Sequence, residues 1–455
     1  MSDDLRFTED QEPINGRFWV AGRQDCKAPG VLYLKKGQEA LLEISMFQDE
    51  GDDPFRPSAP PKTPENSVQS AHRSWFADAC KVLHGEDDQG QRLTLLNCHS
   101  SHSNSTLAKV GHSYNCQTVI FGRSLPSDDL LFDGLEVRFD HQEEWLGHDR
   151  LGQYQNIGDR KTDDERYIKI PISKETALPL NLPNYAKSSL DFVWGASSKA
   201  TEQTFRSWSY LCLQFDSPRT WDQTKEVIQS WRKFFSLAMR TAADLVELRL
   251  LRKDHTYFFK EDQLRGLPTW IARSHSPEVE HPKADRRFHF NFSDIEPQFP
   301  EIVRSWQRIA EPWHAVLHRF FAVTTPRELY MNESFLFLAQ AIEALHRART
   351  GHQDVPMKQA AKEAYLRSPT ELQDYLGPRK AFTDQLHKTR NYWTHHGKPT
   401  PDDDPEVLDD ILLIVMTDKL RFILEAAIMK EIAIPDNCIS NVWSPRWQGH
   451  FVEFK

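Results

Sequence analysis

The sequence lacks the glycine-rich loops that bind phosphate. Its 19 glycines are outnumbered by 27 prolines, and neither GxGxxG nor GxxxxGK(S/T) occurs. The backbone cradles of dinucleotide-binding domains and P-loop NTPases are therefore not indicated. Only six cysteines are scattered through 455 residues. Because disulfide frameworks belong to small secreted domains, we expect reduced thiols and a cytoplasmic location.

Long apolar runs are also missing. The longest strongly apolar run, Ile411–Met416, is far shorter than the roughly 20 residues that a spanning helix needs. The first residues are charged and precede no apolar segment, so we expect neither a signal peptide nor a membrane partner. The formal net charge of -10 argues against general coating of nucleic acid, although it leaves room for a local basic site.

The composition, with 39% hydrophobic and 11% aromatic residues, is that of a globular protein. Short runs of strand-forming residues fill the N-terminal half and predict a β-rich sandwich or barrel-like domain at 1–216. These runs are 17–20, 31–34, 40–44, 93–96, 118–121, 135–139, 167–170 and 209–213. Five prolines between residues 54 and 64 predict an exposed loop over 48–70.

Helical periodicity replaces this pattern after Ser217-Pro218. We expect a helical connecting region at 217–324, with helices at about 218–252 and 301–321. An all-α bundle follows at 325–435, and a tail at 436–455. Within the bundle, Ser368-Pro369-Thr370-Glu371 predicts a capping box, and Pro405 is expected to begin the last long helix. The predicted fold class is α+β.

The most informative segment is 388–397, which contains Arg390 and His395 near the expected end of a helix. Arg390 follows Leu386 by four residues, on a stripe that should face another helix. Burying a cation there is costly unless it has an oppositely charged partner or a functional role. Five helical steps rotate His395 by about 140° from Arg390, so the helix must end near His395 for the two to converge. The bare Arg-x4-His spacing is weak on its own, since Arg347/His352 has a similar spacing.

The surroundings of this segment are locally basic. Residues 379–398 contain five Lys or Arg against the single acid Asp384, a local charge of 5 − 1 = +4. Apart from Arg390, these cations are Arg379, Lys380, Lys388 and Lys398.

Arg390-Asn391-x3-His395, placed after a helix that carries Phe337–Leu345, resembles the HEPN ribonuclease domain, in particular the Apea-like HEPN subgroup. That subgroup follows a β-rich domain in ApeA-type abortive-infection proteins of bacteria. Gly16–Gly22 and Leu135–Trp145 are similar to that N-terminal domain. The resemblance covers most of the chain, and the Arg-Asn-x3-His signature is its most specific piece.

The resemblance implies an anti-phage endoribonuclease that needs no metal or other cofactor and is triggered through its N-terminal domain by a phage-derived partner. His395 would transfer protons and Arg390 would stabilise charge on the phosphate. Asn391, Glu343 and His396 would support them, with Glu343 holding Arg390. The cations Arg379, Lys380, Lys388 and Lys398 would contact RNA. The implied partners are RNA, with tRNA among the candidates, and a second copy of the chain in a homodimer or larger even-numbered assembly.

Other interpretations stay open at this stage. Arg390 and His395 could form only a helix cap and an ion pair with Glu343, and the bundle could be a non-catalytic HEPN domain that dimerises or binds a nucleotide or another ligand. A Cys-x3-His…His-x3-Cys arrangement also offers nitrogen and sulfur ligands for zinc. Its members are Cys98, His99, His102, His112 and Cys116.

Overall fold

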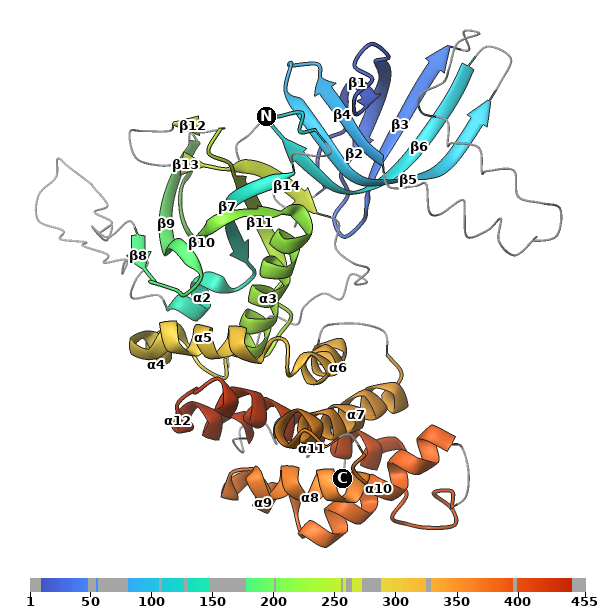
Figure 1. Cartoon of the computed structure of the whole chain (residues 1–455), viewed down its shortest axis with the longest axis vertical. Coiled ribbons are helices and arrows are strands. Elements are labelled where there is room, and N and C mark those ends of the chain that lie inside the picture. Colours follow the sequence, from blue (N-terminus) through green and yellow to red (C-terminus); the bar gives the residue numbers. More distant parts are fainter. Residues whose placement is uncertain are drawn as a thin grey trace, which may run out of the picture.

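The computed structural model describes residues 10–47, 55, 81–105, 109–126, 130–147, 177–199, 202–254, 257–258, 264–271, 288–324, 329–352, 354–395 and 399–443. They form an α+β protein, as predicted, with the β-rich part at one end and the helical bundle at the other (Figure 1). The predicted strand at 167–170 lies outside these residues. So does the predicted loop at 48–70, apart from Phe55, which is buried rather than exposed and accepts a hydrogen bond from the Tyr114 hydroxyl through its carbonyl.

A closed barrel of six strands forms the far end of the β-rich part. Its strands are β1 (Ile14–Val20), β2 (Ala28–Tyr33), β3 (Ala40–Phe47), β4 (Lys81–Asp87), β5 (Arg92–Ser105) and β6 (Lys109–Phe121). Neighbours pair antiparallel in the order β3-β2-β1-β4-β5-β6, and a further β3–β6 pairing closes the ring. Side chains such as Phe18, Leu42 and Leu95 are fully buried in the core.

A second sheet continues from the barrel. It contains β7 (Leu131–Phe139), β8 (Ala177–Pro179), β9 (Tyr185–Lys199), β10 (Glu202–Thr220), β11 (Leu245–Leu251) and β14 (Leu267–Ile271). Because β14 pairs with both β6 and β11, the two sheets form one hydrogen-bonded set of 12 strands. The short strands β12 (Tyr257–Phe258) and β13 (Leu264–Arg265) pair separately.

Helix α3 (Trp221–Met239) packs on the second sheet and corrects the predicted helix at 218–252. It begins at a capping box made by Thr220 and Gln223, because β10 continues through Ser217-Pro218. It ends where Arg240 adopts a left-handed conformation with φ 56°. Residues 245–251 then form β11 between β7 and β14. This central strand is buried on both faces, although Val246, Leu248 and Leu250 alternate with the ion-paired Glu247 and Arg249. The sequence predicts helix here because Leu245 stands seven residues after Ala238 and continues the helical period of α3.

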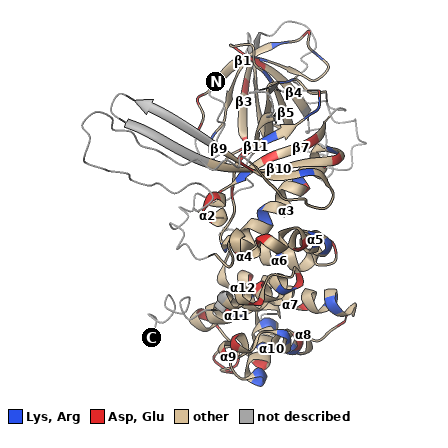
Figure 2. Ribbon diagram, turned by 90° about the vertical axis from the view of Figure 1, so that its left-hand side faces the viewer, with Lys and Arg blue, Asp and Glu red and all other residues tan. Residues whose placement is uncertain are grey.

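The next helices connect the sheet to the bundle (Figure 2). After α2 (Gln142–Leu146) and the strands come α4 (Phe292–Ile295), η2 (Glu296–Gln298), α5 (Phe299–Ile309) and α6 (His314–Thr324). The single helix predicted at 301–321 is therefore wrong, since α5 ends before Pro312. Proline lacks the N–H of a helix interior and its ring clashes with the preceding turn. Phe234 and Trp231 of α3 pack against Phe299 of α5.

The bundle contains α7 (Met331–Thr350), α8 (Met357–Arg367), α9 (Thr370–Leu376), α10 (Arg379–His395) and α11 (Asp410–Glu431), followed by α12 (Asp436–Ile439) and η3 (Ser440–Trp443). The predicted capping box is wrong: Ser368 donates backwards to the Ala364 carbonyl instead of capping α9. Pro405 does not begin α11 either, because residues 401–409 form turns that lead to its start at Asp410.

A buried charge cluster joins the two parts of the chain. Glu425 of α11 is only 1% exposed, and its carboxylate lies 2.8 Å from Arg421 and 3.4 Å from His289, which precedes α4. The guanidinium of Arg240, at the end of α3, lies 5.3 Å from the centre of the Phe422 ring. Burial alone would raise the pKa of Glu425, but Arg421, His289 and Arg240 hold it well below its ordinary value of 4.5. The bundle is thus electrostatically tied to the β-rich part.

Among the described residues, no helix combines the length and the apolar character needed to cross a membrane.

Candidate functional site on helices α7 and α10

An ion pair between α7 and α10 forms the centre of the candidate site. The Nη2 atom of Arg390 lies 3.2 Å from Oε1 of Glu343, and the two side chains are 25% and 14% exposed. On α10, Phe382 and Leu386 are buried and anchor the stripe that leads to Arg390. The contact expected between Glu343 and Arg390 is present. Burial of most of this cation is made tolerable by the opposite charge.

Asn391 extends the ion pair along α10. Nη1 of Arg390 donates to Oδ1 of Asn391 at 3.4 Å, and Nδ2 of Asn391 lies 3.3 Å from Nε2 of His387, one turn earlier. His387 is half-buried, and burial together with the charges of Lys358 and Arg390 lowers its pKa, against a smaller opposing effect of Asp384. Sequence reasoning missed His387, although its spacing of four residues from Asn391 places both on one helix face.

His395 is the last residue of α10, so five helical steps separate it from Arg390 and place the two residues about 140° apart around the helix axis. The His395 side chain is exposed, and within the described part of the chain it makes no hydrogen bond or ion pair. Thr394 donates from its hydroxyl to the Arg390 carbonyl at 2.7 Å, which continues the helix up to its end. His396 and Lys398 lie outside the described residues.

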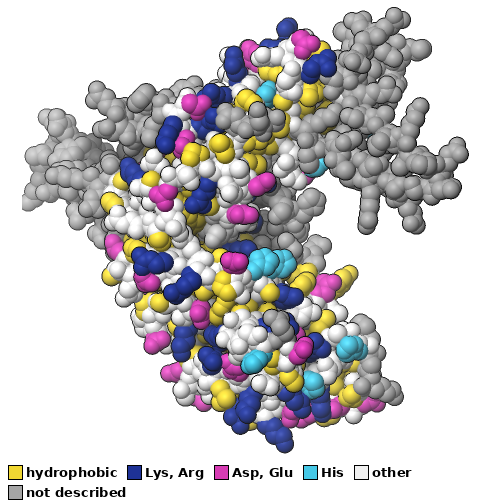
Figure 3. All heavy atoms as spheres, in the orientation of Figure 1, with side chains coloured by type: hydrophobic (Ala, Val, Ile, Leu, Met, Phe, Trp, Pro, Cys, Tyr) yellow, Lys and Arg dark blue, Asp and Glu magenta, His cyan; other side chains and the backbone are white. Residues whose placement is uncertain are grey.

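The basic character of this region is weaker than the sequence count suggested. Lys388 lies 2.6 Å from Asp404 and 2.5 Å from Glu406, and hydrogen bonds to these carboxylates raise its pKa. Both acids follow the segment 379–398 in the sequence, and the loop that carries them brings their carboxylates to Lys388. Figure 3 shows Lys and Arg side chains beside Asp and Glu side chains at the helical end of the molecule.

Arg379 and Lys380 remain exposed at the other end of α10. At 1.5 Å per residue, Arg379 lies about 16 Å along the helix axis from Arg390. Such a separation exceeds the reach of one phosphate group. These two cations therefore do not line the Arg390 site.

The loop before α11 is fastened to the end of α10. The Leu408 backbone N–H donates to the Thr389 hydroxyl at 3.0 Å, and the Trp393 indole N–H donates to the Leu408 carbonyl at 3.2 Å. Directly after this loop, Ile411, Leu412 and Ile414 are 55%, 56% and 37% exposed. An apolar patch therefore starts α11 beside the end of α10 that carries His395.

The alternative zinc constellation is not assembled. Cys98 and Cys116 face each other across β5 and β6 and are buried, whereas His102 is exposed. Burial and the neighbouring Cys98 raise the pKa of the Cys116 thiol, which keeps it protonated. In the parts of the chain that the structure describes, no group of three or more His, Cys, Asp or Glu residues could hold a metal ion.

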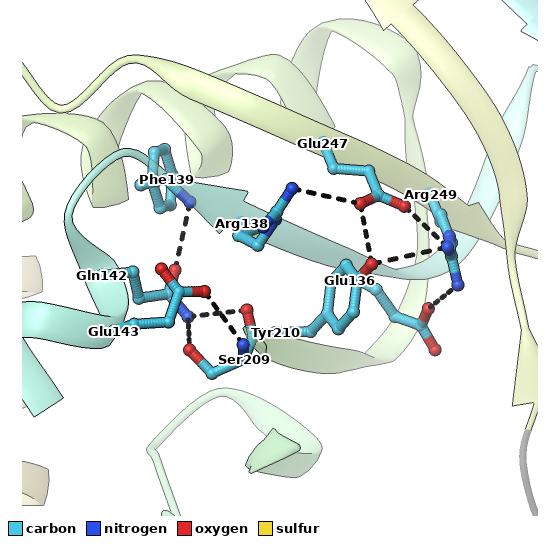
Figure 4. A network of polar contacts seen from close by, with 9 residues as sticks. All are labelled: Glu136, Arg138, Phe139, Gln142, Glu143, Ser209, Tyr210, Glu247 and Arg249. Carbon is cyan, nitrogen blue, oxygen red and sulfur yellow. Dashed lines mark hydrogen bonds and ion pairs between the residues drawn. The ribbon is translucent and has the colours of Figure 1, made fainter. Parts of the chain in front are cut away.

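The second sheet carries a different polar network, shown in Figure 4. Glu247 of β11 accepts a hydrogen bond from Tyr210 at 2.7 Å and pairs with Arg249 at 2.6 Å and Arg138 at 3.7 Å. Burial and the Glu247 charge raise the pKa of Tyr210. Each of these charges has an opposite charge within the network, so we interpret it as a structural element of the sheet.

Comparison with known families agrees with this arrangement. Residues 336–438 match the family described as Apea-like HEPN, which identifies the bundle of α7–α11 as a HEPN domain. Residues 13–306 match the family described as ApeA N-terminal domain 1. The chain therefore belongs to the ApeA-type proteins, HEPN-family proteins of antiphage defence. Comparison with curated proteins and with solved structures gives no match.

The match of residues 13–306 to ApeA N-terminal domain 1 also bears on the domain organisation. It extends from the barrel through β11, β14 and part of α5, and it includes most of the region predicted to be a helical connection. Strands β11 and β14 pair with β7 and β6, so residues 245–251 and 267–271 belong to the β-rich sheets. The helical connection begins later, with α4.

Proposed function

We propose that the protein is an endoribonuclease of antiphage defence that cleaves RNA without a metal ion at a site built on Arg390 and His395. The observation that supports this most is the Arg390–Glu343 ion pair, which fixes the guanidinium between two helices while leaving a quarter of its side chain exposed. HEPN domains are generally ribonucleases, which agrees with this chemistry.

The residue types suit transfer at phosphorus. The 2′-hydroxyl of RNA would attack the adjacent phosphate and lose its proton, and the 5′-oxygen would leave with a proton. A 2′,3′-cyclic phosphate and a 5′-hydroxyl would result. His395 would move one of these protons, an effect typically of about 10²–10⁴-fold. The guanidinium of Arg390 has N–H donors beyond those that meet Glu343 and Asn391, and these would face the charge that grows on the phosphate oxygens.

A second copy of the chain would complete this site. In-line transfer benefits from an acid, a base and charge stabilisation around one phosphorus, whereas one subunit supplies a single Arg390 and a single His395 at this helix end. The exposed apolar residues Ile411, Leu412 and Ile414 lie beside that end and would form part of a two-fold interface. Other apolar residues of α10 and α11 add little to this surface: Phe382, Leu386, Leu420 and Ile423 are buried in the subunit's own core, whereas Val415 and Trp393 are half-buried.

We assign the trigger to the β-rich domain. It makes up most of the chain outside the bundle, and the charge cluster around Glu425 ties it to α11. Because α11 packs on α7, which carries Glu343, a change in the position of the β-rich domain would reach the Arg390 site through two packed helices.

The test is to map RNA ends in infected cells and with purified protein, for the wild type and His395→Ala. The control is His352→Ala, because His352 is exposed at the end of α7, away from the Glu343 contact. We expect 5′-hydroxyl and cyclic-phosphate ends with the wild type and the control, but not with His395→Ala. Protein that binds RNA or nucleotide and leaves it intact under every condition would favour the non-catalytic HEPN alternative.

A further inference from the structure

A third histidine, His387, contributes to the Arg390 site without belonging to the Arg-x4-His pattern. It lies on α10, one turn before Asn391. A chain of contacts runs from Nε2 of His387 to Nδ2 of Asn391 at 3.3 Å, from Oδ1 of Asn391 to Nη1 of Arg390 at 3.4 Å, and from Nη2 of Arg390 to Glu343 at 3.2 Å.

The hydrogen-bonding capacities fix the direction of this chain. Arg390 can only donate, so it requires the carbonyl oxygen of the Asn391 amide on its side. The amide nitrogen then points to His387, and because that nitrogen also can only donate, Nε2 of His387 must accept. His387 must therefore be neutral, with its proton on Nδ1.

The charges around His387 favour the neutral ring. Lys358 of α8 and Arg390 both lower its pKa, in addition to burial. The one acid that acts in the opposite direction, Asp384, is itself paired with Lys358 at 2.8 Å. Nδ1 of His387 is buried and has no hydrogen-bond partner in the described part of the chain, so its proton is left unpaired, and the contact of Nε2 with Asn391 is what selects this tautomer.

We propose that His387 is a positioning residue: as a neutral acceptor it orients the Asn391 amide, which in turn presents the guanidinium of Arg390 to the phosphate. Protonation of His387 places an N–H against the amide N–H of Asn391. Either the contact breaks or the amide turns over, and the turned amide opposes Arg390 with a second donor. This inference rests on the proposed ribonuclease function and adds to it a pH-sensitive residue that is distinct from His395.

The first test compares two substitutions at this position in the full chain. His387→Gln keeps an acceptor near the position of Nε2 but cannot become a cation, whereas His387→Leu removes the acceptor. Misplacement of a reacting group by about 1 Å can cost about 100-fold. We therefore expect kcat of His387→Leu to fall by about 10–100-fold with little change in KM, and His387→Gln to stay within a few-fold of the wild type.

The pH profile separates positioning from a structural role. The wild type should lose activity below the ordinary histidine pKa of 6.5, partly through His387, and His387→Gln should lose less over the same range. The controls are His352→Leu and His352→Gln, which should leave both the rate and the profile unchanged. Equal rates for His387→Leu and the wild type, or an unchanged acid limb in His387→Gln, would overturn the proposal.

A second measurement does not depend on RNA cleavage. Nitrogen NMR of histidine-labelled protein, with the His387 signal identified by its loss in His387→Gln, should show Nδ1 protonated and Nε2 unprotonated at pH 7.5. Asn391→Ala should shift the Nε2 signal. A ring that carries its proton on Nε2 refutes the inference even if the enzyme is active. Wild-type protein that shows the expected tautomer but cleaves no RNA, either in infected cells or when purified, refutes the proposed function alone.

Discussion

Glu425 on α11 and His289 ahead of α4 lie 3.4 Å apart in the interior, and they join the HEPN domain to the β-rich domain. Arg421 holds the other oxygen of the Glu425 carboxylate at 2.8 Å. Ionised groups are costly to bury unless they are paired. The buried carboxylate of the HEPN domain therefore needs groups of the β-rich domain beside it. We conclude that this domain interface is part of the stable fold.

We predict that Glu425→Ala strongly destabilises the protein. The substitution leaves Arg421, whose side chain is 28% exposed, without its carboxylate, so the loss should lie at or below the lower end of the about 3–5 kcal/mol that breaking a fully buried pair costs. Thermal unfolding of the whole chain, followed by circular dichroism, measures the loss. Glu226→Ala serves as the control, because Glu226 is an exposed acid on α3, and it should unfold close to the wild type. A melting temperature of Glu425→Ala equal to that of the control contradicts the structural importance of the cluster.

The same cluster gives the stability a pH dependence. Burial lowers the pKa of His289 below 6.5, so the unfolded chain binds this proton more readily than the folded one. Stability should therefore fall as the pH drops from 6.5 toward 5, before Glu425 itself begins to protonate. His289→Gln should flatten the dependence of the melting temperature on pH over that window. A slope identical to that of the wild type would show that other groups cause it.

Arg390 gives the most specific prediction for the site. Arg390→Ala should lower the cleavage rate by at least about 10²-fold, a loss comparable to removing one donor to a developing oxyanion. Arg390→Lys should fail too, because an ammonium cannot reach Glu343 and Asn391 in two directions while facing a phosphate. Arg347→Ala, near the end of the same helix as Glu343, is the control. Full nuclease activity in either Arg390 variant would contradict the assignment of the site.

Cleavage should survive EDTA. Of the acids near the site, Glu343 is occupied by Arg390, Asp404 by Lys388, and Asp403 accepts hydrogen bonds from Thr400. These carboxylates are committed to other partners, which leaves no pair of them free to bind two metal ions. The measurement is the cleavage rate of purified protein in chelator, with a magnesium-dependent nuclease in parallel. Activity that is lost in EDTA and returns with magnesium would contradict the prediction.

Much of the site on the helices could be predicted from the sequence, and the features that could not be predicted depend on contacts between distant segments. Helix spacing and the family resemblance were enough to single out Arg390, His395 and Glu343. The neutralisation of Lys388 could not be anticipated, because Asp404 and Glu406 reach it through a loop. The Glu425–His289 contact joins residues far apart in the sequence, and single-sequence periodicity carries no information about such pairs.

In the β-rich domain, too, some features could be predicted from the sequence and others could not. Its short strands are recognisable from β-branched and aromatic residues between polar breaks. Strand β11 was missed although Val246, Leu248 and Leu250 alternate with Glu247 and Arg249, because Leu245 stands seven residues after Ala238 and continues the helical period of α3. The closure of the barrel by β3 and β6 is likewise a property of the assembled sheet.

The last prediction is that two subunits share each site. Arg390→Ala and His395→Ala protein should each be inactive alone, yet an equal mixture that exchanges subunits should recover up to about a quarter of the wild-type rate if each composite site takes its arginine and histidine from different subunits, because about half of the dimers are mixed and each mixed dimer has one intact site. Leu412→Asp adds a charge to the exposed patch at the start of α11 and should shift sedimentation toward the monomer and lower activity together. Leu366→Asp, at an exposed leucine of α8, is the matched control and should change neither. Full activity of Leu412→Asp as a monomer at nanomolar concentration would show that one subunit is sufficient for cleavage.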